Sequence, residues 1–319
     1  MPLHELMAVV PGPSSQSGFA QVLTCPTGIE LVTLHLAIHT GGANVSTPID
    51  AKQRAADTYN AASDFYDHPV NTFWERYGRR TVSRLRLNAG GRVLDVCCGS
   101  GASAIPAAEA IGPRGFVLGV DLADNLLTLA RAKAKDRGFI NTEFRVGDLL
   151  DLQLSPAGFD AVVCVFGIFF VPDMRAAVAE LWRHVRPGGQ LAITTWGPHF
   201  FEPVNSIFWN AVRAARPDLY KGFNPWDRIS EPDALRALFI DAGTVPPDVV
   251  ADISQHPLGS PDDWWPMVLG TGYRGTVEQL DSAARERVRD ECLTFIRRTG
   301  VQSVEANVLY ASATKPQPT

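Results

Sequence analysis

Between residues 92 and 196 the sequence alternates short apolar runs with stretches of helical periodicity, and no other feature constrains the fold as strongly. Such alternation is typical of parallel strands joined by crossover helices. The expected strands are Arg92–Cys97, Phe116–Asp121, Thr142–Val146, Phe159–Phe166 and Gln190–Trp196. With one helix in each interval, the sequence predicts nine alternating elements that begin and end with a strand.

Two of these helices have clear boundaries. Asp124 can cap a helix whose apolar positions follow the 3.6-residue period, and Gly138 ends it. Met174 begins a second apolar stripe, which the run Pro187-Gly188-Gly189 stops. The segment Ala161–Phe166 is apolar throughout, as expected when helices cover both faces of a parallel sheet.

Length and charge narrow the class of protein. With 319 residues the chain can form one large or two small domains, and a net charge of −5 gives no electrostatic footprint for nucleic acid. No apolar run reaches the roughly 18 residues of a membrane span, so we expect no stable membrane insertion. The five cysteines are too scattered for a disulfide framework, which favours a cytoplasmic protein; they are Cys25, Cys97, Cys98, Cys164 and Cys292.

The start of the chain differs from the rest. Residues 1–51 contain no Lys or Arg, and residues 1–49 show no sustained period, so we expect a loosely ordered N-terminal appendage there. Within it, His35 and His39 have a spacing that can hold a metal ion on a helix. No third ligand accompanies them, and we predict no metal site.

The ends of the first three expected strands hold residues that suit an adenosine. Gly99-Ser100-Gly101 forms a strand-to-helix turn where a ligand can approach bare backbone N–H groups. Asp121 ends the second strand, where its carboxylate can accept hydrogen bonds from the two hydroxyls of a ribose. Asp148 follows the third strand, where an adenine amino group could donate to it. Because the carboxyl ends of parallel strands lie at one edge of the sheet, we expect these groups to lie together.

These residues resemble the motifs of class I S-adenosylmethionine-dependent methyltransferases. The resemblance rests, in order and spacing, on residues 93–101, Gly119-Val120-Asp121, Gly147-Asp148-Leu149, Phe159-Asp160 and Arg186-Pro187-Gly188-Gly189. Within that class the chain is similar to the small-molecule group that includes the ubiquinone and menaquinone C-methyltransferases. The resemblance implies an α/β fold with a Rossmann-like, doubly wound, seven-stranded sheet, helices on both faces and an antiparallel last strand.

The resemblance also implies a set of residues that bind S-adenosylmethionine. They are Asp95, Gly99, Ser100, Gly101, Asp121, Leu122, Asp148, Leu149, Val165 and Phe166, together with Tyr59 and Tyr66 from a preceding helix. That helix would cover the cofactor as a lid, although an ordinary core role for its aromatic residues is equally compatible with the spacing. One departure is Cys97, which stands where such proteins often have their first glycine.

The expected layout is one methyltransferase domain after the appendage. Residues 50–90 would form the helical lid, residues 91–198 the cofactor-binding core, and residues 199–319 the acceptor pocket and the last two strands, near Val249–Gln255 and Ala306–Ala311. The tryptophan-rich part of this last region suits a planar or lipid-like acceptor. An oligomer is possible but not indicated.

The predicted reaction is in-line methyl transfer to a small-molecule acceptor, which gives S-adenosylhomocysteine. A base is needed only where the acceptor must first lose a proton, and we name His199, after the fifth strand, as the candidate, ahead of His68 and His256.

Two other functions stay open. The glycines and Asp121 also fit a dinucleotide site, so an NAD(P)-dependent oxidoreductase is the alternative, although Asp148 has no counterpart there and no Tyr-x-x-x-Lys pair occurs. A scaffold that binds the cofactor without turnover is the other.

Overall fold

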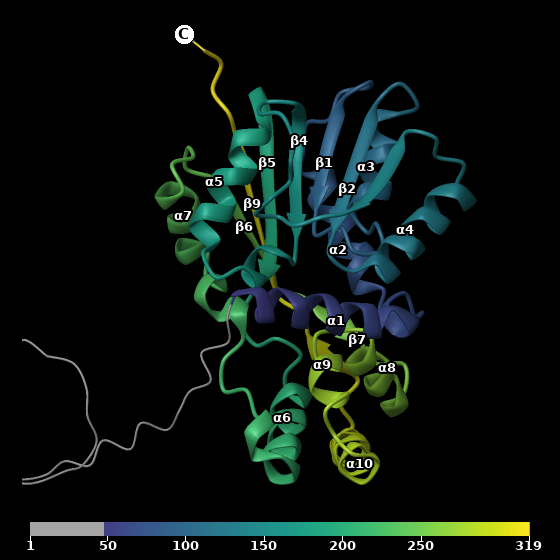
Figure 1. The fold of residues 1–319 in the computed structure, drawn as a ribbon. Coiled ribbons are helices and arrows are strands. Elements are labelled where there is room, and N and C mark those ends of the chain that lie inside the picture. The colour runs from purple at the N-terminus through teal and green to yellow at the C-terminus, as the bar shows by residue number, and fades with distance from the viewer. Residues whose placement is uncertain (1–47, 319) are drawn as a thin grey trace, which may run out of the picture. The chain divides into compact units, whose positions relative to one another are not determined.

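The structure is a computed structural model that describes residues 48–318. Its centre is a seven-stranded sheet with the order β3-β2-β1-β4-β5-β9-β6 (Figure 1). The first five strands are parallel, and β9 lies antiparallel between β5 and β6. The strands of this sheet are β1 (Arg92–Val96), β2 (Phe116–Asp121), β3 (Thr142–Val146), β4 (Phe159–Val165), β5 (Val185–Trp196), β6 (Asp248–Asp252) and β9 (Val308–Thr314). The predicted fold class, with its antiparallel last strand, is confirmed.

Alternate side chains of the strands enter two separate cores. Val93 and Val117 pack on one face of the sheet, whereas their neighbours Leu94 and Leu118 pack on the other. This alternation follows from the two-residue period of a strand. Helices cover both faces of the sheet (Figure 1). One face is covered by α3 (Ala104–Ile111) and α4 (Asp124–Asp136), and the other by α5 (Met174–His184) and α7 (Pro232–Asp241).

One predicted helix is wrong. Among the described residues, the segment between β3 and β4 contains no helix, so the strict alternation of strand and helix fails there. Asp148 accepts a hydrogen bond from the Leu150 N–H, and the Asp151 N–H donates to the Asp148 carbonyl, which turns the backbone. Turns formed by Asp side chains compete with helix formation in so short a segment.

The end of α5 also differs from the prediction. The helix ends at His184, and residues 185–189 continue as the first part of β5, where Val185 pairs with Phe159. The Pro187-Gly188-Gly189 run therefore lies within the strand, and the register between Phe159 and Ala161 shifts beside it. Proline and glycine in a strand commonly mark such an irregularity.

The order of the sheet reverses at β1 and β4. The chain builds β2 and β3 on one side of β1, and β4 and β5 on the other. A crevice forms beyond the carboxyl ends of the strands at such a reversal. In Figure 1 the helix α1 (Pro48–Tyr66) runs across these strand ends, and α6 (Val204–Ala215), α8 (Trp264–Leu269), α9 (Arg274–Val277) and α10 (Ser282–Thr299) lie on its far side.

The late strands are more broken than predicted. The expected strand Val249–Gln255 is split, because β6 ends at Asp252 and Gln255 begins a separate strand. That strand, β7 (Gln255–Pro257), pairs with β8 (Ser303–Glu305) in a two-stranded sheet that the sequence did not suggest. The helix α2 (Phe73–Ser83) follows α1 and packs against α3.

The predicted appendage, residues 1–49, lies outside the described residues except for its last two positions, which begin α1. His35 and His39 are therefore not described. Among residues 48–318, none of the helices combines the length and the apolar character that a membrane span requires.

Candidate active site

Two adjoining cavities lie where α1 crosses the strand ends. The outer cavity, about 270 Å³, borders the ends of β2 and β3, and the inner cavity, about 80 Å³, borders the turn after β1. They share six lining residues, which makes them one cleft: Ala55, Cys97, Asp121, Leu122, Gly167 and Phe170. Ala55 belongs to α1, so this helix is a wall of both cavities.

The turn after β1 has an unusual backbone. Cys97 has a φ of 57° and Gly99 a φ of 54°, both in the left-handed region. Glycine adopts that region without a steric cost, so the side chain of Cys97 makes this position more strained than a glycine would. A Cβ on Gly99 would lie 2.9 Å from the hydroxyl oxygen of Tyr66, so the glycine leaves space that α1 closes from above.

Asp121 holds the turn and lines both cavities. Its carboxylate accepts hydrogen bonds from the Gly99 N–H at 2.8 Å and the Ala123 N–H at 2.9 Å. Burial raises its pKa, against the effect of these hydrogen bonds, which favour the ionised form. The sequence-based prediction that Asp121 lies beside the glycine turn agrees with this geometry.

Asp148 lies at the far end of the outer cavity, where it forms an ion pair with Lys52 of α1 at 2.7 Å. Leu149 lines the same cavity. The ion pair ties the first turns of α1 to the loop after β3. A ligand amino group at Asp148 would therefore compete with, or share, the Lys52 ammonium.

Val165 ends β4 on the other side of the sheet reversal and Phe166 follows it, and both line the inner cavity. Phe166 has a φ of 55° and stacks on Trp196, with ring centroids 4.1 Å apart. Leu122 lines both cavities. The structure thus brings these three predicted residues to the cleft.

Three predicted residues do not line the cleft and lie behind the turn instead: Asp95, Ser100 and Gly101. Asp95 is buried, its Oδ2 accepts a hydrogen bond from the Ser103 hydroxyl at 2.7 Å, and its Oδ1 has no partner among the described residues. Burial, more than the nearby Asp121, raises the pKa of Asp95 to about 7. Ser100 is also buried, and its hydroxyl donates to Asp67.

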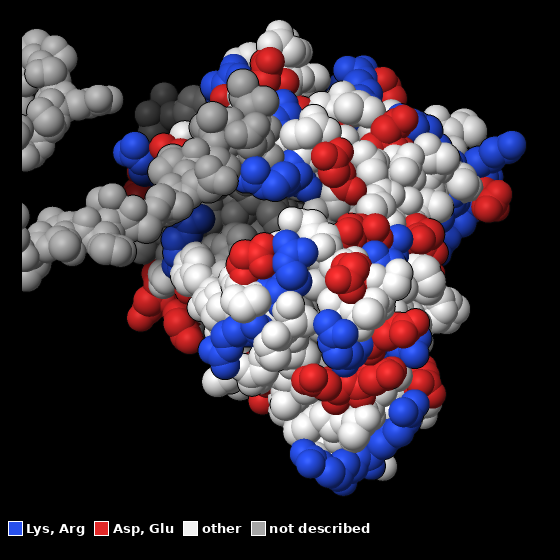
Figure 2. Space-filling model, turned by 60° about the horizontal axis from the view of Figure 1, so that its bottom comes forward, with Lys and Arg blue, Asp and Glu red and all other residues white. Residues whose placement is uncertain are grey.

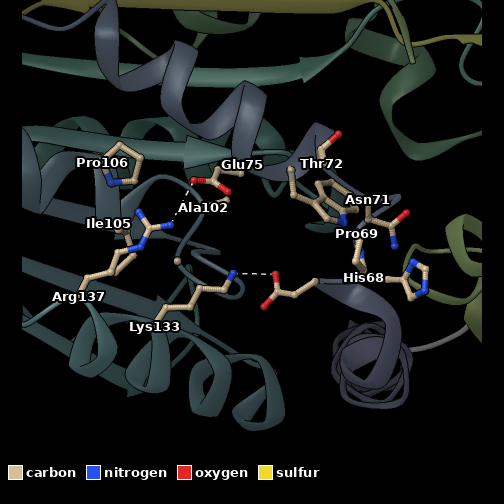
Figure 3. A pocket seen from close by; sticks show the side chains of 13 residues that line it. His68, Pro69, Asn71, Thr72, Glu75, Ala102, Ile105, Pro106, Lys133 and Arg137 are labelled. Carbon is tan, nitrogen blue, oxygen red and sulfur yellow. Dashed lines mark hydrogen bonds and ion pairs between the residues drawn. The ribbon is translucent and has the colours of Figure 1, made fainter. Parts of the chain in front are cut away.

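Gly101 borders a different cavity of about 290 Å³, between α2, α3 and α4, which we call the rear cavity (Figure 3). Its charged groups neutralise one another: Lys133 pairs with Asp67 at 2.7 Å, and Arg137 pairs with Glu75 at 3.4 Å. Lys133 also donates to the Ser100 hydroxyl at 2.8 Å. This network fixes the glycine turn from behind and joins it to the end of α1.

Tyr59 and Tyr66 of α1 both line the inner cavity. Their rings meet edge to face at 6.2 Å, and Tyr66 stacks on Trp74 at 5.0 Å. Burial raises the pKa of both phenols, so they remain protonated donors. Tyr59 also lines a third cavity, which we call the aromatic cavity, with Trp74 and Phe170. The aromatic cavity, about 100 Å³, therefore adjoins the cleft.

The candidate bases do not lie in the aromatic cavity lining. His199 is exposed, with a φ of 62°. His256 is buried, and its Nε2 lies 2.7 Å from the Val70 carbonyl oxygen, while His68 borders the rear cavity. The prediction that His199 acts as a base gains no support from this position.

The sequence missed several residues of the cleft. Lys52 and Ala55 were only assigned to a lid in general, and Trp74 and Phe170 were not singled out at all, although both line the inner and the aromatic cavity. Phe170 belongs to the one-turn helix Ile168–Phe170, for which a three-residue run gives almost no periodic signal. Only the fold brings these side chains to the strand ends.

Gly167 offers a test of how tightly the sheet reversal is packed. Its φ is negative, but a Cβ there would lie 2.3 Å from the Cβ of Cys97. We expect Gly167→Ala to destabilise the protein by about 1–3 kcal/mol in urea unfolding, because the crowded site must shift. Gly158→Ala is the control, since its nearest neighbour would be 3.6 Å away. Equal stability of the two variants would show that the packing beside Cys97 is loose.

Comparisons with known proteins agree with the motifs. Residues 93–189 match the family described as "Methyltransferase domain". The chain is 34% identical over 140 residues to the demethylmenaquinone methyltransferase of Listeria monocytogenes, which is 44% of this chain and 58% of that protein. The chain thus spans less than two thirds of the length of this relative.

Solved structures share the fold at low identity. Phosphoethanolamine N-methyltransferase 2 of Haemonchus contortus, in complex with phosphomonomethylethanolamine and S-adenosylhomocysteine, matches with a TM-score of 0.52 and 18% identity, over 86% of this chain and 61% of that one. The [4+2]-cyclase SpnF matches with a TM-score of 0.53 and 17% identity, over 84% and 97%. The cyclase shows that this fold alone does not fix a reaction. The resemblance found in the motifs is nevertheless confirmed: residues 93–189 match a methyltransferase domain, and the chain is similar to class I S-adenosylmethionine-dependent methyltransferases such as the demethylmenaquinone methyltransferases.

Proposed function

We propose that this protein is an enzyme that binds S-adenosylmethionine in the cleft and transfers its methyl group, by in-line displacement, to a small molecule held in the aromatic cavity. The observation that supports this most is that the three cavities adjoin one another in a row. Asp148 lies at one end, Asp121 lies in the middle, and Tyr59, Trp74 and Phe170 join the cleft to the aromatic cavity. This order corresponds to adenine, ribose and methyl acceptor.

The residues present fit the cofactor. The cleft has a carboxylate for a ribose at Asp121, and Gly99 leaves room where a Cβ would meet Tyr66. Asp95, buried behind the turn at Gly99, accepts a hydrogen bond from the Ser103 hydroxyl and helps to hold the turn in place. When bound, the cofactor supplies an activated methyl group on a sulfonium.

The chain's own contribution is to bind, orient and exclude water. Positioning alone can supply up to roughly 7–11 kcal/mol of the barrier to a two-substrate reaction. Asp121 and the turn at Gly99 would fix the donor, and the aromatic rings would fix the acceptor. Tyr59 lies between the two sites, and its hydroxyl makes no hydrogen bond within the described residues, so it can donate to a bound acceptor.

A small molecule suits the site better than nucleic acid. The net charge is −5, and Figure 2 shows Lys and Arg side chains interspersed with Asp and Glu on the face drawn, outside the grey residues. A nucleic-acid site requires a continuous basic surface. The aromatic cavity instead offers a site between aromatic rings for a compact acceptor.

The experiment that tests the proposal compares cofactors and then turnover. S-adenosylmethionine at 100 times its Kd should stabilise the full-length chain by about 2.7 kcal/mol and raise its Tm, whereas NAD(P)H should not. Stabilisation by NAD(P)H alone would favour the oxidoreductase alternative. A labelled-methyl screen over quinols, phenols, amines and carboxylic acids follows, and binding without any transfer would favour the scaffold alternative.

A further inference from the structure

The aromatic cavity has an unusual balance of polar groups. Its walls are rings from several parts of the fold, among them Phe169, Trp196, Phe200 and Trp226. Its one charged lining residue among those described is Lys221, in the loop before the short helix Pro225–Ile229. Within the described part of the chain, no carboxylate and no histidine line it.

Lys221 is free to meet a ligand. Among residues 52–318, whose side chains the structure describes, no carboxylate lies within ion-pair distance of its ammonium group. Its Nζ lies 5.7 Å from the centre of the Trp209 ring, which holds it over another wall of the cavity. Partial removal from water and the nearby Arg54 lower the pKa of Lys221, as expected for a cation without a counter-ion.

Two buried donors belong to the same walls. The indole N–H groups of Trp74 and Trp209 have no hydrogen-bond partner in the described part of the chain, and both rings line the aromatic cavity. The indole N–H of Trp264, outside this cavity, differs because it lies against the Cys292 thiol. Unpaired buried donors are uncommon, so these two indole groups are unusual features of the rings around the cavity.

These observations together describe an aromatic cavity with one cation and, in the described part of the chain, no carboxylate in its lining. We propose that the aromatic cavity binds a planar acceptor molecule through an oxyanion, a carboxylate or a phenolate, that forms an ion pair with Lys221. This proposal rests on the proposed function, because it names the chemical class of the methyl acceptor. An ammonium ligand would also find aromatic rings to stack on, but Lys221 already holds the cationic position over Trp209 and would repel it.

Three compounds that share one ring system but differ in charge test whether the cavity prefers an oxyanion. We would measure the binding of 2-naphthoate, 2-naphthamide and 2-naphthylmethylammonium to the full-length chain loaded with S-adenosylhomocysteine, by quenching of tryptophan fluorescence. We expect 2-naphthoate to bind at least tenfold more tightly than the other two. In Lys221→Gln this preference over 2-naphthamide should fall to less than threefold, whereas Lys221→Arg should retain most of it.

The controls separate this proposal from the function itself. Lys135→Gln removes an exposed lysine of α4 and should leave the binding of all three probes unchanged. Because Lys221 lines the aromatic cavity and not the cleft, its replacement should not alter folding or the affinity for S-adenosylhomocysteine. Equal binding of the three probes, or a preference for 2-naphthoate that survives in Lys221→Gln, would overturn the oxyanion proposal. Failure of the chain to bind S-adenosylhomocysteine would instead overturn the proposed function.

Discussion

Asp121→Ala should lower the affinity for S-adenosylmethionine by at least 100-fold in isothermal titration calorimetry. The carboxylate at the end of β2 lines both parts of the cleft, and its loss removes two expected hydrogen bonds to ribose hydroxyls. Hydrogen bonds to a charged group contribute about 1.5–3 kcal/mol each, and about 2.7 kcal/mol corresponds to a 100-fold change in Kd. No other single substitution in the cleft should weaken the binding of the cofactor as much.

A second variant keeps this prediction testable, since Asp121 also accepts hydrogen bonds from the N–H groups of Gly99 and Ala123. Asp121→Asn retains one acceptor oxygen and should weaken cofactor binding less than Asp121→Ala. Circular dichroism would establish that both variants are folded. Wild-type affinity in a folded Asp121→Ala protein would show that the ribose binds elsewhere.

The stability of the free protein should depend on pH through Asp95. Its pKa is about 7 when folded, whereas an exposed aspartate has a pKa near 3.8. Below pH 4 the carboxyl is protonated in both states. Between pH 4 and pH 7 the unfolded chain releases the proton while the folded chain keeps it, so the free energy of unfolding falls as the pH rises. The full loss is of the order of 4 kcal/mol, at 1.36 kcal/mol for each pKa unit.

Asp95→Asn removes this titration. The amide oxygen can still accept the hydrogen bond from Ser103, so the local geometry should be retained. Urea unfolding at pH 5 and pH 8 measures the effect. From pH 5 to pH 8 the free energy of unfolding of the wild-type protein should fall by several kcal/mol relative to that of the variant. Parallel pH dependence of the two proteins would mean that Asp95 is ionised throughout.

The sequence predicted the sheet well because each strand end is marked by a local signal. The bounds of β2 and β3 match the predicted ranges, and Asp121 and Asp148 lie at the predicted strand ends. Buried parallel strands leave a continuous apolar run, and their glycine and aspartate boundaries are set by backbone conformation. The turn at Gly99 was predicted for the same reason, and the structure adds that Cys97 shares its left-handed backbone.

The rest depends on contacts between distant residues. Nothing in the local pattern shows that Lys52 pairs with Asp148 or that Trp74 reaches the inner cavity. The walls of the aromatic cavity come from segments that are far apart in the chain, so only their packing reveals that Lys221 stands among aromatic rings. In the same way Asp95 has a motif position typical of the family, but its burial and unpaired oxygen follow from the packing of α3 on the sheet.

The most direct test of the account is a crystal structure of the chain with S-adenosylhomocysteine. We predict an adenine ring beside Asp148 and Leu149, a ribose on Asp121, and a sulfur atom that faces the aromatic cavity past Tyr59. A nucleoside bound anywhere else, such as in the rear cavity beside Lys133 and Arg137, would contradict the assignment of the cleft.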